Sequence, residues 1–426
     1  MIAKNKTESH IKPRLIVFDV EGVILPKRRY LLFEASRRIG FLKFLKMLWA
    51  GLLYEAGLIP LEKALSRIFK QLKGLTVEEM FQVYKKMPLI LGVQNAFKRL
   101  KEEGYRTALI SSGLPQFIVD DLAKRLSADY ATGLNVETIE NRLTGKISGD
   151  VIKPNGKELV LRRIVEEEGL KPNDCVVVAD DRNNLSMFPS CSFRIGYNPD
   201  FLLSLRSDVV AKGDFDEVLQ AITSVGSERI KVGHSLSKRD FTRETIHVSG
   251  FFVAVVCMLL SLNSIFVALL IFIVTGIYVI SELARMFGYN VPVAATITWH
   301  AALSPEIYEF VTAPIFFALG IMLALIVFPP PVSYGAIAVF TLGDSFATLF
   351  GKKFGRHVYP YNKGKKVEGT LLGLSIAWLG AWLFIGNPFK ALVGAAVGMF
   401  VETLPAPVND NLTIPLFSGL TLLLLP

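Results

Sequence analysis

The distribution of hydrophobic and polar positions divides the chain into two parts. Up to about residue 232, short apolar runs alternate with segments in which apolar residues recur at helical spacing. From about residue 246 onward, long apolar runs dominate. Alternating strands and helices are typical of an α/β domain, whereas long apolar runs indicate membrane helices. The sequence therefore predicts a soluble domain at 1–228, a basic linker at 229–245 and an all-α polytopic membrane domain at 246–426.

Four short apolar runs in the first part end in polar residues and are predicted to be strands. They lie at 15–25, 106–114, 174–184 and 193–199. Amphipathic helical patterns precede the second and third runs, at 93–104 and 156–169. Buried parallel strands with polar residues at their carboxyl ends are where open α/β sheets place their active sites. The pattern predicts a doubly wound sheet with a site at that edge.

The second part contains seven apolar runs, each near or slightly below the ~20 residues that span a bilayer. They lie at about 246–262, 264–281, 310–328, 332–350, 370–386, 388–404 and 412–426. A shorter run, 291–303, contains Trp299 and His300 and is predicted to be re-entrant or interfacial. Ser304 and Pro305 then indicate a helix start. We expect about seven membrane spans.

Charge indicates the orientation of these spans. The linker 229–243 and the loop 352–366 are the most basic segments outside the apolar runs, and four runs lie between them. Under the positive-inside rule both segments face the cytosol. The first residues have no apolar signal core, so the soluble domain is also predicted to be cytosolic, on a protein integral to the cell membrane. The same reasoning places several polar residues at the cytosolic ends of their spans: Glu282, Arg285, Asp344, Glu402 and Asp410.

Composition narrows the possible partners. The 426 residues are 51% hydrophobic and carry a formal net charge of +9. The basic residues gather beside apolar runs and no nucleic-acid-binding motif is present, which favours anionic headgroups and nucleotide over nucleic acid. The cysteines Cys175, Cys191 and Cys257 show no paired or metal-ligand spacing and are predicted to be reduced packing residues.

A basic, glycine-rich segment follows Asp344. Glycines let backbone N–H groups approach phosphate oxygens, lysines supply positive charge, and a carboxylate can hold Mg²⁺ against the same phosphates. We interpret Asp344 as a metal ligand and catalytic residue beside a nucleotide. The predicted nucleotide-binding residues are Gly351, Lys352, Lys353, Gly355, Lys365, Lys366, Glu368 and Gly369. The Walker A spacing is absent, and the spacing alone fits a cytosolic anchor equally well.

Several separated motifs carry a family resemblance. GDSFATLFGKKFG, KGKKVEGTLLG and VETLPAPVNDNLTIPL, preceded by RETIHVSG and SELARMFG, resemble the dolichol kinase and phytol kinase family. The resemblance implies a CTP-dependent, Mg²⁺-dependent kinase that acts on dolichol, another polyprenol or a lipid with a free glycerol hydroxyl. Arg243 and His247 either contact a headgroup phosphate or mark the membrane interface. Glu282 and Arg285 form either a structural ion pair or part of the site.

The polar ends of the predicted strands carry a second resemblance. LIVFDVEGVIL, RTALISSGL and DCVVVADDRNN resemble the haloacid dehalogenase superfamily, in particular its phosphoserine-phosphatase-like branch, over residues 14–224. The resemblance implies a Mg²⁺-dependent phosphatase with Asp19 as nucleophile and Glu21 as general acid and base. It further implies that Ser111 binds the phosphoryl group, that Lys157 neutralises charge and that Asp180 holds the metal together with Asp19. Asn183 matches a polar residue of the last motif.

Two residues depart from that family pattern. Glu21 stands where an aspartate is usual and reaches one methylene further. Asn184 replaces an aspartate that helps to hold the metal, and Asp181 is placed to compensate. A degenerate domain without activity is the alternative. Residues 28–88 fall where this branch inserts a substrate-selecting cap, and they carry basic and aromatic residues such as Arg28, Arg29, Trp49 and Tyr54. A small phosphorylated metabolite is the expected substrate class.

Two alternatives to the lipid kinase remain. A CTP:phosphatidate cytidylyltransferase carries a similar pattern of an acid followed by a Gly-Lys-Phe-Gly element, but its C-terminal signature is replaced here by VNDNLTIPL. A membrane scaffold that tethers a phosphatase-like domain would require the glycines of GKKFG and KKVEG to be incidental. The lipid kinase is the preferred hypothesis.

Overall fold

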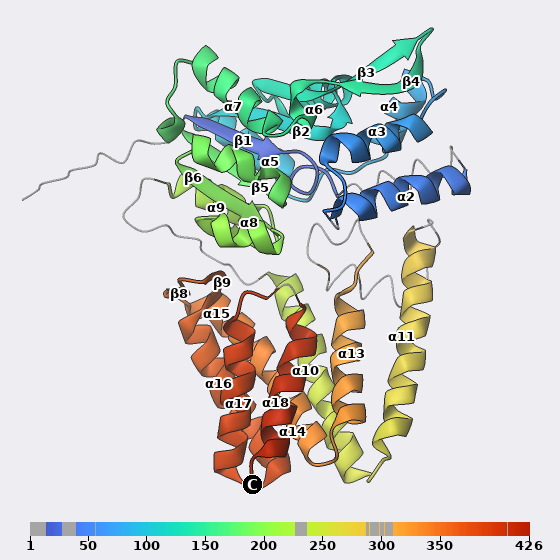
Figure 1. Ribbon diagram of the computed structural model, residues 1–426. Helices are drawn as coiled ribbons and strands as arrows, with labels where there is room; N and C mark the ends of the chain where they lie inside the picture. Colours follow the sequence, from blue (N-terminus) through green and yellow to red (C-terminus); the bar gives the residue numbers. More distant parts are fainter. Residues whose placement is uncertain are drawn as a thin grey trace, which may run out of the picture. The chain divides into compact units, whose positions relative to one another are not determined.

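The computed structural model describes residues 14–27, 40–55, 57–225, 237–286, 289, 298, 302, 310–406 and 408–426. The chain forms two compact units, Met1–Val232 and Gly233–Pro426. In Figure 1 the first unit is coloured blue to green and the second runs from yellow-green to red. The first is an α/β unit and the second, in its described residues, is largely helical.

The first unit is built on a parallel sheet in which β1 is central. In the described residues the strand order is β4-β3-β2-β1-β5-β6-β7. β1 pairs in parallel with β2 on one side and β5 on the other, whereas β3 and β4 form an antiparallel hairpin. The strands are β1 Leu15–Asp19, β2 Arg106–Pro115, β3 Tyr130–Ile139, β4 Arg142–Ser148, β5 Cys175–Ala179, β6 Phe193–Tyr197 and β7 Val209–Ala211. The predicted α/β fold with a parallel sheet is confirmed.

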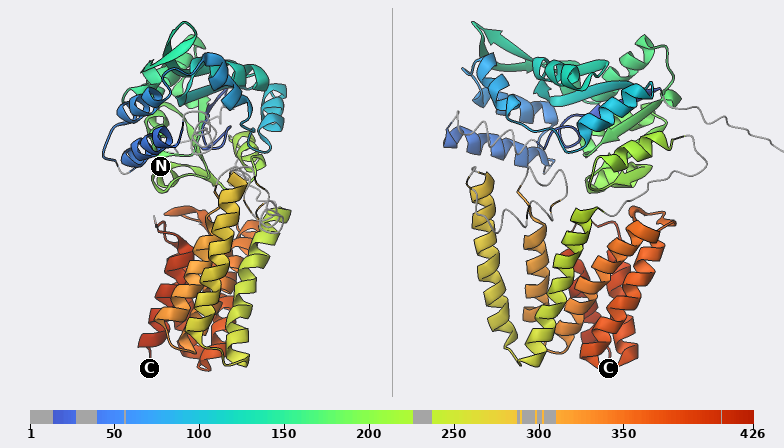
Figure 2. Two further views of the ribbon diagram at one scale, coloured as in Figure 1. Left: turned by 90° about the vertical axis from the view of Figure 1, so that its right-hand side faces the viewer. Right: turned by 180° about the vertical axis from the view of Figure 1, so that it is seen from behind.

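Helices connect the strands. The α-helices are α2 Phe41–Glu55, α3 Leu61–Gln71, α4 Val77–Lys85, α5 Val93–Glu102, α6 Gln116–Leu126, α7 Gly156–Glu167, α8 Phe201–Arg206 and α9 Asp216–Thr223. The 3₁₀ helices are η1 Asp150–Ile152, η2 Pro172–Asp174 and η3 Arg182–Ser190. The views in Figures 1 and 2 agree that α2, α3 and α4 form a group at the end of this unit where the β3–β4 hairpin projects. These helices fall within the predicted cap at 28–88, whose residues 28–39 lie outside the described part.

Aromatic side chains pack around Phe18 of β1 in the core of this unit. Phe18 is fully buried, and its ring centroid lies 4.7 Å from that of Phe97 and 6.2 Å from that of Phe215. Phe215 in turn meets the ring of Tyr197 edge to face at 5.3 Å. Because Phe18 immediately precedes Asp19, this packing fixes the strand end that carries the predicted nucleophile.

The second unit is a set of helices with one short hairpin. Its elements are α10 Lys238–Leu259, α11 Ser264–Met286, α13 Ala313–Val327, α14 Val332–Ala338, the π-helical η5 Val339–Gly343, α15 Asp344–Phe354, β8 Val358–Tyr359, β9 Asn362–Lys366, α16 Val367–Ile385, α17 Pro388–Thr403 and α18 Asp410–Leu424. α14, η5 and α15 follow one another without a break.

Four helical stretches in the described residues are long and apolar enough to cross a membrane. They are Lys238–Leu259, Ser264–Arg285, Val332–Phe354 and Val367–Ile385. The runs predicted at 310–328, 388–404 and 412–426 correspond to α13, α17 and α18, which have 15, 16 and 15 residues. At ~1.5 Å per residue such helices are shorter than the ~30 Å hydrocarbon core. The structure thus supports four candidate spans and does not establish the predicted seven.

Two boundaries differ from the sequence-based prediction. Residues 238–245, assigned to the linker, already belong to α10, because Ser237 and Asp240 form a capping box that starts the helix there. Lys352 and Lys353 belong to α15 instead of a loop. The predicted re-entrant run 291–303 and the helix start at Ser304 lie outside the described residues, apart from Thr298 and Ala302.

Small residues let the helices around Asp344 approach closely. A Cβ atom added at Gly373 would lie 2.6 Å from the backbone oxygen of Gly343, and one at Gly369 would lie 2.4 Å from that of Ala347. Small residues at such contacts are characteristic of packed membrane helices. They bring the start of α16 against α15, on either side of the basic hairpin.

We predict that Phe18→Ala lowers the free energy of unfolding of the first unit by about 3–5 kcal/mol, because it removes the central ring of the core. Urea unfolding of a fragment covering residues 1–225 measures this change. Leu159→Ala, at a position 51% exposed on α7, is the control and should change stability by no more than about 0.5 kcal/mol. Equal losses in the two variants would contradict the central role of Phe18.

Candidate functional site

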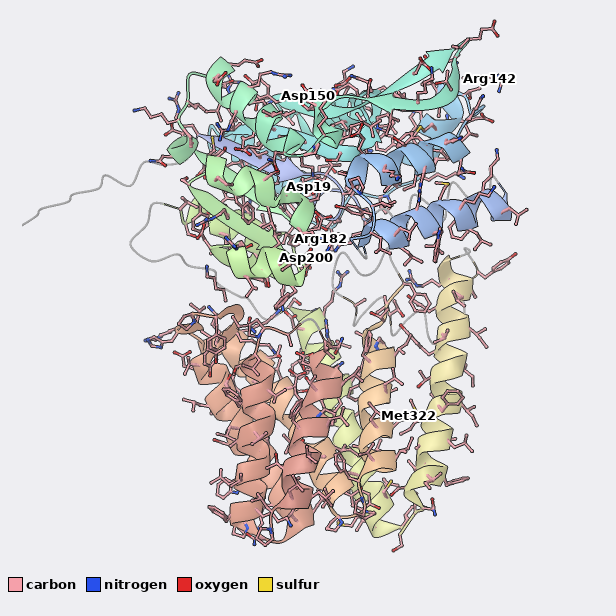
Figure 3. The ribbon with its side chains drawn as sticks, in the orientation of Figure 1. Asp19, Arg142, Asp150, Arg182, Asp200 and Met322 are labelled. Atoms are coloured by element: carbon pink, nitrogen blue, oxygen red, sulfur yellow. The ribbon has the colours of Figure 1, made fainter. Side chains whose placement is uncertain are left out.

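The first site lies where β1 and β5 end side by side. Phe18 and Val178 are register partners in the parallel pair, so Asp19 and the residues after Ala179 emerge at the same edge of the sheet. Asp180 and Asp181 follow directly, and both Asp19 and Asp180 are buried. Figure 3 shows Asp19 in the same region as Arg182, at the start of η3. The parallel register therefore brings together acids that are far apart in the sequence.

Asp19 is held from three directions. The Nζ atom of Lys157 lies 2.8 Å from Oδ1 of Asp19, and the backbone N–H of Val20 donates to the same oxygen at 2.8 Å. The Nδ2 atom of Asn184 donates to Oδ2 at 2.5 Å. Lys157 also donates to Oδ1 of Asn184 at 2.7 Å. Asn184 thus connects the lysine to the carboxylate, a position that its sequence motif did not reveal.

Three carboxylates could hold a metal ion. One oxygen each from Asp19, Asp180 and Asp181 lie within 4.8 Å of one another. Oδ1 of Asp180 is buried and accepts no hydrogen bond in the described residues. Its Oδ2 atom lies 3.2 Å from Nζ of Lys27. Oxygen donors of this kind suit Mg²⁺, so the residues present fit the ion that the sequence predicts.

Burial and mutual repulsion raise the pKa values of two of these acids. Burial raises the pKa of Asp19 to about 6, with Lys157 opposing and Glu21 and Asp181 adding to the rise. Burial and the neighbouring Asp181 raise the pKa of Asp180 well above its usual range. Carboxylates confined together in a low-dielectric site disfavour one another's ionisation. A divalent cation would relieve this repulsion.

Glu21 lies beside the predicted phosphoryl-binding serine. The hydroxyl of Ser111 donates to Oε2 of Glu21 at 2.7 Å and accepts from the backbone N–H of Leu114 at 2.9 Å. Gly22, with a φ of +86°, turns the chain after Glu21, and a Cβ at Gly22 would lie 2.0 Å from Oδ2 of Asp180. Glycine is therefore required for the approach of this loop to the acids.

The predicted Asn183 has a more peripheral position. Its backbone N–H donates to Oδ1 of Asp181 at 3.0 Å, and its Nδ2 donates to the hydroxyl of Ser112 at 3.4 Å. The structure thus gathers the predicted residues of this site at one sheet edge and adds Lys27, which sequence reasoning missed. The only signal for Lys27 was its place soon after the first strand and its glycine turn.

A second cluster lies in the other unit, around Lys365 of β9. Nζ of Lys365 lies 3.7 Å from Oδ1 of Asp344 and 3.4 Å from Oδ2 of Asp410, and it contacts Glu402 as well. Burial lowers the pKa of Lys365, but the three carboxylates more than offset it and leave the pKa well above its usual range. Nδ1 of His247 lies 3.8 Å from Oδ2 of Asp344. These residues come from four separate sequence motifs.

Several predicted members of the nucleotide loop are engaged elsewhere. Lys352 pairs with Asp240 at 2.7 Å, and Lys353 is exposed with its Nζ 5.2 Å from the ring of Phe354. Glu368 accepts the backbone N–H groups of Arg356 and His357 at 3.0 and 3.2 Å. These contacts organise the hairpin.

The glycines of the loop pack tightly in place of forming an open cradle. A Cβ at Gly369 would lie 2.7 Å from Cα of Gly351, and a Cβ at Gly355 would lie 2.6 Å from Cγ of Lys366. Gly351 lies within α15, and Gly355 is the C-cap residue of that helix. In this arrangement these glycines serve the close packing of helix and hairpin, and nucleotide binding by the loop stays a prediction.

Glu282 and Arg285 form a structural unit of their own. They pair at 2.5 Å one helical turn apart, and Glu282 accepts the backbone N–H of Val311 at 2.9 Å. Sequence reasoning missed Glu244, which is 5% exposed and whose Oε2 atom accepts no hydrogen bond in the described residues. Its place next to Arg243, in the motif RETIHVSG, was the available signal. Glu244 lies one turn before His247 on α10.

Comparison with known proteins identifies proteins that the first unit resembles. Residues 16–188 match the family model of haloacid dehalogenase-like hydrolase. A phosphoserine phosphatase of Methanocaldococcus jannaschii is 28% identical over 212 residues, which cover 50% of this chain and 98% of that protein. A phosphoserine phosphatase of Archaeoglobus fulgidus is 31% identical over 185 residues, which cover 43% of this chain and 52% of that protein.

Among solved structures, a substrate-bound phosphoserine phosphatase complex is 26% identical and matches 49% of this chain and 98% of its own, with a TM-score of 0.45. On the family model and the curated relatives, the N-terminal half carries a haloacid dehalogenase-like phosphatase domain similar to phosphoserine phosphatase.

We predict that Mg²⁺ stabilises the first unit and that Asp180→Asn removes most of this effect. A ligand at 100 times its dissociation constant stabilises the folded state by about 2.7 kcal/mol. Thermal unfolding with and without Mg²⁺ measures the shift. The control is Asp150→Asn, which changes a carboxylate paired with Lys153 and Arg163 and belonging to another cluster. An undiminished shift in Asp180→Asn would rule out Asp180 as a ligand.

Proposed function

We propose that the first unit hydrolyses small phosphomonoesters in two steps, through a phosphoryl group carried on Asp19. The observation that carries this proposal is the set of contacts around Asp19: Lys157 and Asn184 hold its carboxylate, and two more acids lie within metal-ligand reach. A phosphatase that uses a carboxylate nucleophile needs that oxygen oriented and the surrounding negative charge balanced.

The residues have complementary roles in these steps. An oxygen of Asp19 attacks phosphorus, and the bond to the leaving oxygen breaks as Glu21 gives that oxygen a proton. Glu21 then accepts a proton from the water that attacks the phosphoryl group on Asp19, and the bond between the Asp19 oxygen and phosphorus breaks, which releases phosphate and restores the carboxylate. Lys157 neutralises charge on the nucleophile throughout, and the hydroxyl of Ser111 orients Glu21 and the phosphoryl oxygens. Mg²⁺, when bound by Asp19, Asp180 and Asp181, would neutralise phosphate charge.

The substrate class follows from the relatives and the cap. The relatives that match this half are phosphoserine phosphatases, so phosphoserine is the first substrate to test among small phosphorylated metabolites. The helices α2, α3 and α4 stand between β1 and β2 in the chain, at the place of a substrate-selecting cap. Arg182 connects this cap to the site, because its guanidinium donates to the backbone oxygen of Tyr54 at 3.1 Å.

We predict that Asp19→Asn lowers phosphatase turnover by roughly 10³-fold or more, because an amide cannot act as the nucleophile. Release of phosphate from phosphoserine and from p-nitrophenyl phosphate, with Mg²⁺ present, measures the activity. Asp216→Asn, at an exposed position on α9, is the matched control and should retain parental turnover. Parental turnover in Asp19→Asn would exclude this nucleophile, and an inactive parent on a broad panel of phosphomonoesters would favour the degenerate domain.

For the second unit we propose phosphorylation of a lipid alcohol, with CTP as donor, at the cytosolic face of the membrane. The observation that favours it is the convergence of Asp344, Lys365, Glu402 and Asp410, which come from three separate motifs of the kinase-like pattern. Phosphoryl transfer depends on positioned positive charge and on acids that can hold Mg²⁺. Dolichol, another polyprenol and a diacylglycerol or dialkylglycerol are the acceptors to test.

The residues of this cluster suggest how the charge would be used. Lys365 pairs with three acids in this structure. In the proposed reaction Lys365 would instead bind a nucleotide phosphate, and Asp344 with the other two acids would bind Mg²⁺. In this proposal Glu244 and His247 of α10 would contact the lipid hydroxyl, since Nδ1 of His247 lies 3.8 Å from Oδ2 of Asp344. This assignment leaves Lys352 and Glu368 with the structural contacts described above.

A cytidylyltransferase and a non-catalytic scaffold are the competing functions of the second unit. The products distinguish them. Transfer of the γ-phosphate of CTP to lipid indicates a kinase, whereas release of pyrophosphate with a cytidylyl-lipid indicates the cytidylyltransferase. Absence of both reactions with every acceptor favours the scaffold.

We predict that Asp344→Asn and Lys365→Met each abolish transfer of the labelled γ-phosphate from CTP to lipid. The aspartate variant should lose mainly the Mg²⁺-dependent part of CTP binding, and the lysine variant should bind CTP more weakly with or without Mg²⁺. Lys390→Met is the matched control, since Lys390 donates to the backbone oxygen of Leu425 and not to this cluster. Parental transfer in both site variants would show that the cluster is structural.

A further inference from the structure

Helix α2 of the first unit presents an apolar face to solvent. Leu42 is 75% exposed, Trp49 is 62% exposed and Leu52 is 47% exposed. With Leu45, these residues follow one another at spacings of three, four and three, which places them on one side of the helix. Met47 and Ala50, each 1% exposed, face the core instead. One side of the helix is therefore buried against the core, and the opposite side is exposed to solvent.

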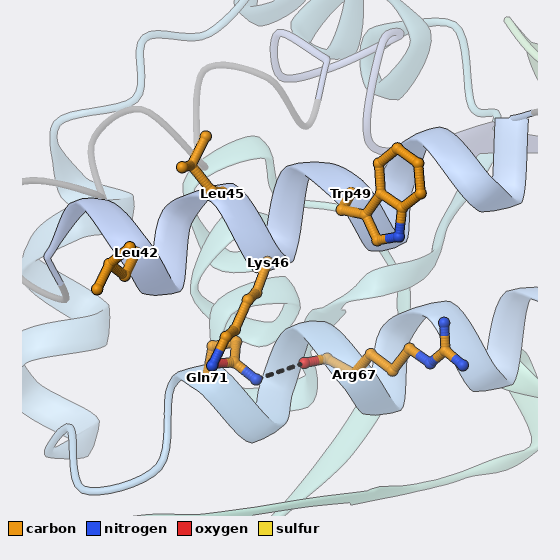
Figure 4. A pocket seen from close by; sticks show the side chains of 6 residues that line it. All are labelled: Leu42, Leu45, Lys46, Trp49, Arg67 and Gln71. Carbon is orange, nitrogen blue, oxygen red and sulfur yellow. Dashed lines mark hydrogen bonds between the residues drawn. The ribbon is translucent and has the colours of Figure 1, made fainter.

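The uncovered side is bordered by positive charge. Lys43 and Lys46 are exposed on α2, and Lys63, Arg67 and Lys70 are exposed at helical spacing on α3. A groove of about 430 Å³ runs between the two helices. Figure 4 shows its lining residues, with Leu42, Leu45 and Trp49 on α2 and the long side chain of Arg67 on α3. Apolar residues bordered by lysine and arginine are the pattern of a helix that lies in a membrane interface.

We propose that α2 is a membrane-docking helix whose apolar face, Leu42, Leu45, Trp49 and Leu52, enters the surface of a bilayer that contains anionic phospholipid. Leucine side chains and an indole ring fit the boundary between headgroups and acyl chains. The basic residues on α2 and α3 would lie at the level of the phosphate groups. A bilayer is available to this helix, because the same chain carries four helices that can cross one.

Charge favours a bilayer over a second copy of the chain as the occupant. A symmetric pair formed through this face would bring Lys43 and Lys46 of each copy close to those of the other. Like charges at a contact are unfavourable, whereas anionic headgroups attract them. Soluble proteins rarely leave apolar patches of this kind uncovered, so the face is expected to have a partner.

The test uses the full chain with Cys175, Cys191 and Cys257 replaced by serine or alanine. A single cysteine at position 45, introduced as Leu45→Cys, carries an environment-sensitive fluorophore. The protein is reconstituted into vesicles of phosphatidylcholine with phosphatidylglycerol, and nitroxide-labelled lipid is added as a quencher. Leu159→Cys, on the exposed side of α7, carries the same fluorophore as the matched control.

We expect several-fold stronger quenching at position 45 than at position 159. The pair Lys43→Glu and Lys46→Glu should reduce quenching at position 45, as should vesicles of phosphatidylcholine alone. Equal quenching at positions 45 and 159 would overturn the proposal. So would a blue-shifted fluorophore at position 45 that lipid nitroxide does not quench, because protein would then cover the face. Unchanged quenching in the glutamate pair would refute the role of anionic lipid.

Discussion

The crowding of carboxylates at one edge of a parallel sheet is the constraint on which the first unit depends. Adjacent parallel strands end at the same edge, so β1 and β5 deliver Asp19, Asp180 and Asp181 to one place. Such a cluster is stable only when positive charge is held among the acids. Lys157 and Lys27 supply part of that charge, while burial, together with the neighbouring acids, keeps the pKa values of Asp19 and Asp180 raised.

The surrounding structure serves to hold this cluster. Phe18, one residue before Asp19, is locked by aromatic packing in the core. Gly22 turns the chain so that Glu21 stays next to Ser111 without a Cβ striking Asp180. Arg182 follows Asp181 directly and donates to the backbone oxygen of Tyr54 in the last turn of α2, so the helix proposed to dock on a membrane also contacts the segment that carries two of the acids.

The second unit also gathers several carboxylates, but there they surround one lysine. There a partly buried lysine, Lys365, lies among Asp344, Glu402 and Asp410. Its charge balances acids that would be costly at the end of a membrane helix. Both clusters consist of residues that are remote in sequence and meet at the ends of elements.

Sequence patterns predicted the parallel sheet and its polar edge, because the carboxyl ends of parallel strands meet at the same edge of a sheet. They did not predict where β1 stops. Residues 20–25 are as apolar as the strand, yet they form a buried turn in which the N–H of Ile24 donates to the backbone oxygen of Val20. Asn184 was interpreted as a weakened metal ligand, but its amide can both accept from Lys157 and donate to Asp19. Composition does not reveal such dual contacts.

In the second unit the acids at the helix ends were predictable from charge, whereas the role of the glycine-rich segment was not. Lys352 pairs with Asp240, a contact across 112 positions of sequence that no local pattern encodes. Gly369 and Gly351 permit close backbone packing, which has the same sequence signature as an open phosphate loop. Helix α13 is also shorter than the apolar run 310–328, whereas α10 and α11 are longer than their runs.

The most direct test of the account is to trap the phosphoryl group on the first unit. The full chain is incubated briefly with phosphoserine labelled with ³²P and Mg²⁺, quenched in acid, digested and analysed by mass spectrometry. The account predicts one labelled peptide, containing Asp19, whose label is removed by neutral hydroxylamine as expected for an acyl phosphate. Phosphate release without a labelled peptide, or a label on any other residue, would contradict it.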